Sequence, residues 1–127
     1  MHEQDIAILK ALVPVAWADG NYAAAEREMI EALLVAYEAT DAEKKNIHDF
    51  ASEKRTLDDI DLQELAAEDR RILLQHAVLL TFADGAQGPD EGAFLDRLAE
   101  KLRIPDGEAK TVILAATDRA KKNLHLL

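Results

Sequence analysis

Two stretches of the chain, WADGNYAAAEREMIEALL at residues 17–34 and FADGAQGPDEGAFLDRLA at residues 82–99, carry one pattern that decides the fold. Each reads aromatic-Ala-Asp-Gly, then five residues, then Glu, and then apolar residues at three- and four-residue steps. Such steps place apolar side chains on one face of a helix. A glycine favours the left-handed turn that ends a helix. The pattern therefore predicts a helix ending at the Asp, a turn at the Gly, and a second helix with the Glu in its first turn.

The second stretch aligns with the first at a constant offset of 65 residues (82 − 17), and the same offset aligns residues on both sides of the motif. Upstream, Leu9 aligns with Leu74. Downstream, Leu33 aligns with Leu98. A long match at one fixed offset indicates a duplication, and we expect an approximate two-fold axis to relate the halves.

From this repeat we predict an all-α fold, a compact bundle of about six to seven helices from two pseudo-symmetric three-helix repeats. One domain is expected over residues 1–127, because a chain of this length fits a single core. The repeats should cover about 3–51 and 67–121, and the polar, charged segment at about 52–61 is expected to be a linker.

Local signals give approximate ends for the helices. Asp41 is the expected N-cap of the third helix, and Pro89 is the expected first residue of the fifth. Pro14 removes a hydrogen-bond donor inside the first helix, so a kink is expected there. The predicted segments are about Glu3–Asp19, Ala24–Tyr37, a helix after Asp41, a short turn near Leu62, Ala67–Asp84, a helix from Pro89, and a last helix that frays after Asn123.

The two acid–glycine corners have two interpretations. In the structural one, Glu26 and Glu91 stand at the third position of their helices and cap them, each cap contributing about 1 kcal/mol. In the functional one, each Glu converges with the preceding Asp19 or Asp84 on a hard divalent cation, which prefers several oxygen ligands. The predicted metal ligands are therefore Asp19, Glu26, Asp84 and Glu91. The ion would be calcium, magnesium or manganese.

The charge is negative and uneven. The chain has a formal charge of −10. Residues 1–64 hold 15 acidic and 6 basic side chains, a net −9, whereas residues 65–127 hold 10 and 9, a net −1. Binding to a nucleic-acid backbone depends on Lys and Arg, so no nucleic-acid partner is expected. A cation or a basic protein partner suits such a surface.

Several other classes of function lack their residues. There is no cysteine, which excludes disulfides, thiolate zinc sites and thiol catalysis. No two of the four histidines stand three or four residues apart, so a histidine zinc site is not expected. No phosphate-binding loop or nucleophile elbow is present. We therefore expect no enzyme activity. With no signal peptide and no transmembrane segment in the sequence, we expect a cytoplasmic protein.

The corners resemble the tellurite-resistance TerB-like family. The residues that carry the likeness are Ala18-Asp19-Gly20 with Glu26, Ala83-Asp84-Gly85 with Glu91, and the run from Phe94 to Leu102 before Ile104. The resemblance implies an all-helical duplicated bundle, paired acids as proposed metal ligands, and a role in tellurite or metal stress, including a peripheral membrane-associated complex.

The chain also departs from the family pattern. Tyr22 and Gln87 stand where the family usually has a branched aliphatic residue, and Ala23 to Ala25 replace residues that are polar or acidic in relatives. The second corner keeps Asp90 beside its Glu and is the better expected cation site. A second hypothesis remains beside the cation: a metal-free helical adaptor that docks a basic protein partner through its acidic face.

Overall fold

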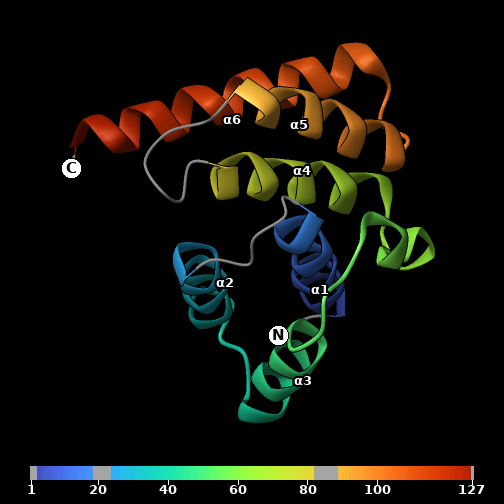
Figure 1. Ribbon diagram of the computed structural model, residues 1–127, viewed down its shortest axis with the longest axis vertical. Coiled ribbons are helices and arrows are strands. Elements are labelled where there is room, and N and C mark those ends of the chain that lie inside the picture. The colour runs from blue at the N-terminus through green and yellow to red at the C-terminus, as the bar shows by residue number, and fades with distance from the viewer. Residues whose placement is uncertain (1–2, 19–23, 82–88, 127) are drawn as a thin grey trace.

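The computed structural model describes residues 3–18, 24–81 and 89–126, and these form an all-helical bundle, as the sequence predicts (Figure 1). The described residues contain no strand. The elements in chain order are α1 (Glu3–Ala18), α2 (Ala24–Ala36), α3 (Asp41–Ala51), the 3-10 turns η1 (Leu57–Asp59) and η2 (Leu62–Glu64), α4 (Ala67–Thr81), α5 (Pro89–Lys101) and α6 (Asp106–Leu126).

The helices follow the constant offset found in the sequence. Helices α2 and α5 begin at Ala24 and Pro89, and both last 13 residues. Helices α3 and α6 begin at Asp41 and Asp106. Both pairs of starts are separated by the same offset as the two sequence motifs, so α1 to α3 and α4 to α6 are two successive sets of three.

Helices α2 and α5 also end in the same way. Glu38 and Arg103, which align with each other in the repeat, have left-handed φ values of 57° and 58°. Behind them, the Ala39 N–H donates to the Leu34 carbonyl at 2.9 Å, and the Ile104 N–H donates to the Ala99 carbonyl at 3.1 Å. This six-to-one bond satisfies a carbonyl that the end of a helix otherwise leaves open. The motif turns the chain sharply into α3 and α6.

The following helix start differs between the halves. Thr40 caps α3, because its side chain accepts from the Glu43 N–H at 3.2 Å while the Glu43 carboxylate accepts from the Thr40 N–H at 2.8 Å. The prediction of Asp41 as N-cap is therefore wrong by one residue. Pro105 occupies the equivalent position before α6, and it has neither a side-chain hydroxyl nor a backbone N–H. The equivalent acid, Glu108, instead pairs with Arg71 of α4.

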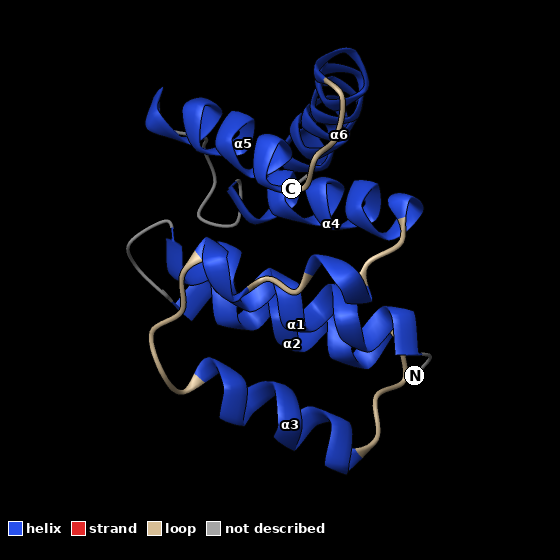
Figure 2. Ribbon diagram, turned by 90° about the vertical axis from the view of Figure 1, so that its right-hand side faces the viewer, coloured by secondary structure: helices blue, strands red, loops and turns tan. Residues whose placement is uncertain are grey.

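The two sets of helices pack on each other as two layers, and the core runs within each layer and between them (Figures 1 and 2). Helices α4, α5 and α6 form one layer, and α1, α2 and α3 form the other. The first helices of the two sets, α1 and α4, pack on each other at the centre. Their aligned Leu9 and Leu74 are both 0% exposed. The largest fully buried side chains are Ile8, Leu9, Leu12, Val13, Ile30, Leu34, Ile47, Leu73, Leu74, Leu95, Leu98 and Leu102.

The segment at 52–61, expected to be a linker, is ordered against the bundle. Turn η1 packs on α1, and Ile60 is 5% exposed. Lys101 of α5 also reaches Asp58 at 3.0 Å. Apolar burial and an ion pair thus hold a segment whose composition alone indicates a solvated connection. The last helix runs to Leu126, beyond the expected fraying point at Asn123.

Candidate functional site

The predicted acid–glycine corners are described only in part. Asp19 and Asp84 lie outside the described residues. Glu26 and Glu91 are the third residues of α2 and α5, as predicted, and only their helical positions are described. Within residues 3–18, 24–81 and 89–126, no group of three acidic or histidine side chains is close enough to hold a metal ion. The corner acids therefore remain predicted ligands.

The end of α1 before the first corner is held by Trp17. Its indole N–H donates to the Ala51 carbonyl, at the end of α3, at 3.1 Å. A half-buried indole needs such a partner, because its one polar group is otherwise left without a hydrogen bond. This bond fixes the direction in which α1 enters the corner.

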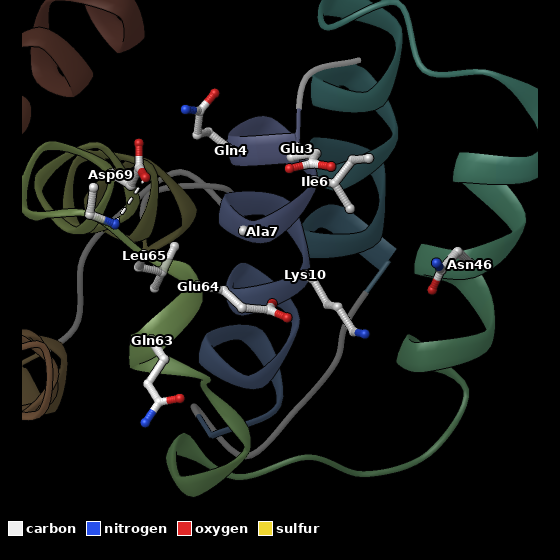
Figure 3. Close-up of a pocket in the computed structure, with 11 residues that line it drawn as sticks. Glu3, Gln4, Ile6, Ala7, Lys10, Asn46, Gln63, Glu64, Leu65 and Asp69 are labelled. Atoms are coloured by element: carbon white, nitrogen blue, oxygen red, sulfur yellow. Dashed lines mark hydrogen bonds between the residues drawn. The ribbon is translucent and has the colours of Figure 1, made fainter.

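The described residues do contain a groove, which lies between α1, α3 and the segment 62–66 that includes η2 and leads into α4 (Figure 3). We call this segment the η2 connection. The volume of the groove is about 890 Å³, within the range of ligand-sized sites. Ile6 and Ala7 of α1 contribute apolar surface, while Glu64 points from the η2 connection toward α1. A smaller hollow adjoins it, sharing Ala7, Lys10 and Glu64. We call the two together the acidic groove.

Five carboxylates line the acidic groove, against one amine: Glu3, Asp59, Asp61, Glu64 and Asp69, with Lys10. Three of the five act as local caps. Asp59 accepts from the Thr56 N–H at 2.8 Å, Asp61 from the Gln63 N–H, and Asp69 from the Ala66 N–H, both at 3.0 Å. Glu3 and Glu64 have no hydrogen-bond or ion-pair partner among the described residues. Their charge is therefore available to a ligand.

The single amine in the groove is already engaged. The Lys10 ammonium lies 5.1 Å from the centre of the Phe50 ring. The guanidinium of Arg55 lies 4.0 Å from the same ring. A cation over an aromatic face is attracted by the ring's negative π surface. Two cations thus lie against the Phe50 ring, and neither forms an ion pair with Glu3 or Glu64 among the described residues.

A second polar contact joins the end of α2 to α4. The Tyr37 hydroxyl lies 3.1 Å from Nε2 of His76, and the rings meet edge to face. Nδ1 of His76 is buried and has no hydrogen-bond partner among the described residues. Burial lowers the pKa of His76 below its usual 6.5, because the charged form is poorly solvated there. Burial also raises the pKa of Tyr37, with the Asp5 carboxylate adding to the effect.

The depressed pKa of His76 predicts a loss of stability in mild acid. Well above pH 6.5 the ring is neutral in both the folded and the unfolded chain, and its contribution to stability is constant. As the pH falls below 6.5, the unfolded chain takes up the proton first, so unfolding becomes more favourable. Denaturant titrations from pH 7.5 to 5 should show a steeper decline for the wild type than for His76→Gln. Equal slopes in the two proteins would contradict the prediction.

Sequence reasoning did not find the acidic groove. The net −9 of residues 1–64 indicated an acidic face, but no motif indicated which acids share a surface. The groove residues come from α1, α3 and the segment 59–69, which are far apart along the chain. The spacing of residues within any one segment therefore does not predict that these acids share a groove.

No helix in the described part of the chain combines the length and the apolar character needed to cross a bilayer.

Comparison with known proteins gives one match. The family model described as "Tellurite resistance protein TerB" matches residues 5–114, which includes both corners and all six helices in whole or part. No curated protein and no solved structure matches the chain.

Proposed function

The chain belongs to the TerB family of tellurite resistance proteins, and we propose that it is a non-catalytic binding domain that takes divalent cations at its two corners. Calcium, magnesium and manganese are the candidate ions. The setting we propose is a cytoplasmic response to metal or oxyanion stress, in contact with a protein partner and with a peripheral membrane-associated complex.

One observation supports the cation proposal most. Helices α2 and α5 begin at aligned positions of the repeat, so Glu26 and Glu91 take the same third position after the same Ala-Asp-Gly sequence. A carboxylate in the first turn and one before the bend supply oxygens of the kind that hard cations bind. Capping by itself requires the Glu but not the Asp. Isolated corners with so few ligands should bind at millimolar to sub-millimolar concentrations, like the sparser sites of this class.

A substitution at Glu91 separates the two interpretations. Glutamine at the third helical position can still accept a hydrogen bond from the N-cap N–H, as in half of a capping box, but it lacks the charge that a cation needs. If Glu91 is a ligand, Glu91→Gln should lose cation binding with a nearly unchanged midpoint of thermal unfolding. Asp84→Asn should lose binding in the same way. The exposed Asp118 of α6, which is not part of either corner motif, provides the matched control Asp118→Asn.

The measurement is an NMR titration with calcium, magnesium and manganese. We expect calcium or magnesium shifts, and manganese broadening, confined to residues near 19–26 and 84–91. These signals should vanish at the second corner in Asp84→Asn and persist in Asp118→Asn. Small, uniform shifts that Asp84→Asn does not change would refute the cation proposal.

The second candidate function is a metal-free adaptor that docks a basic protein partner. The unpaired charges of Glu3 and Glu64 in the acidic groove favour it. Such docking should weaken as salt rises toward physiological strength, because exposed charges are screened beyond about 8–10 Å. Binding that ignores salt would remove its electrostatic basis.

A further inference from the structure

We propose that the acidic groove is the docking site for a basic amphipathic helix of a partner protein, an inference that rests on the second candidate function. The groove supplies both parts of such a site. Ile6 and Ala7 provide apolar surface, and carboxylates stand on the α1 side and on the η2 side of it.

The all-helical fold of the described residues argues against binding by strand addition. Peptides that bind by strand addition need an exposed sheet edge, and residues 3–18, 24–81 and 89–126 offer none. A helix instead lays its apolar face into a groove and reads it through side chains at i, i+3 and i+4. A volume of about 890 Å³ accommodates several such side chains.

Charge decides the chemistry of that helix. Glu3 and Glu64, the two carboxylates without a partner among the described residues, line the groove from α1 and from the η2 connection. Asp69 adds a third carboxylate, which is 8% exposed and accepts a hydrogen bond from the Ala66 N–H. Lysine or arginine flanking an apolar stripe complements this arrangement and speeds encounter. A second copy of this chain suits the groove poorly, because two molecules of charge −10 repel each other.

The test uses the full chain and a synthetic peptide of about 18 residues, with Leu along one helical face and Lys along the other. A second peptide keeps the lysines and replaces every leucine with serine. Binding is followed by fluorescence anisotropy with EDTA present, so that cations play no part. We expect the Leu–Lys peptide to bind, and the Ser–Lys peptide to bind at least about tenfold more weakly, because it cannot fill the apolar surface.

Variants of the chain locate the site. Glu3→Gln with Glu64→Gln should weaken the Leu–Lys peptide about tenfold. Glu38→Gln with Glu100→Gln removes the same charge from exposed positions outside the groove and should change affinity less than about twofold. Asn46→Trp, an exposed change on the α3 side, should also weaken binding by obstructing the groove.

Equal weakening by the two glutamine pairs would overturn the proposal, because it would show attraction to net charge alone. Equal binding of the two peptides would overturn it too, and so would self-association of the chain, seen by light scattering, in place of peptide binding. The corner variants Asp84→Asn and Glu91→Gln should leave peptide affinity unchanged. The two proposals can therefore fail independently: the groove variants test peptide docking, and the corner variants test cation binding.

Discussion

Replacing Arg70 with methionine is expected to lower the free energy of unfolding by about 2–4 kcal/mol. The guanidinium donates to three carbonyls: Nε to Leu65 at 3.0 Å, Nη1 to Leu102 at 3.3 Å and Nη2 to Leu62 at 2.8 Å. It thereby joins α4, the η2 connection and the end of α5. Methionine keeps much of the apolar stem but donates nothing, so three carbonyls lose a charged donor.

Urea titrations of Arg70→Met, Arg70→Lys and Arg97→Met would measure this effect. Lysine is a flexible point charge without a planar fork, so it should recover only part of the loss. Arg97 is exposed on α5, and its replacement should stay within about 0.5 kcal/mol of the wild type. An Arg70→Met protein as stable as the Arg97→Met control would show that water replaces the guanidinium without cost.

The Arg70 contacts also bear on the acidic groove. Leu65 and the neighbouring Glu64 form one side of the groove, and two of the three carbonyls belong to this connection. A loosened connection should move Glu64 away from α1. Arg70→Met should therefore also weaken the Leu–Lys peptide under conditions where the chain is still folded.

Truncating Leu98 to alanine is expected to lower the free energy of unfolding by about 2–5 kcal/mol, whereas the same change at the aligned Leu33 should cost about 1 kcal/mol. Leu98 is 0% exposed, and Leu33 is only partly buried. A fully enclosed leucine leaves a cavity when truncated, whereas a partly exposed one gives up less buried area and water fills the space.

The two leucines stand on helices with different neighbours. Helix α5, which carries Leu98, packs on both α4 and α6, whereas α2, which carries Leu33, packs chiefly on α1. Thermal and urea unfolding of the two alanine variants, with the pair Leu9→Ala and Leu74→Ala as a matched comparison, would measure the difference in stability. Leu9 and Leu74 are both fully buried, so their losses should be similar. Equal losses at Leu33 and Leu98 would contradict the burial argument.

Much of the fold is predictable because its signals are local. The apolar period and the Pro89 start lie within a few residues of the helices that they specify, whereas the predicted turns at Gly20 and Gly85 lie outside the described residues. The one N-cap error has a local cause as well: Thr40 and Asp41 are both good caps, and Thr40 has the Glu three residues on that completes a capping box. The resemblance to the TerB family that the two Ala-Asp-Gly motifs indicate is confirmed by the family match over residues 5–114.

The corner acids were also chosen from sequence. Glu26 and Glu91 are the third residues of α2 and α5, a position that suits capping and cation binding alike. Whether Asp19 and Asp84 join them in holding an ion stays a prediction. A capping role and a cation-binding role cannot be told apart from the sequence, since both need an acidic residue in the first turn of a helix.

The sequence by itself determined the helices, their order and their repetition, because hydrogen bonding within a helix and at its ends involves residues close in the chain. Only the tertiary structure decided that Glu3 and Glu64 share one groove, that Arg70 ties three carbonyls together, and that Leu98 is buried more deeply than Leu33. Each of these depends on the distance between segments far apart along the chain. These distances are set by how the helices pack on one another, which a repeat of residue types does not encode.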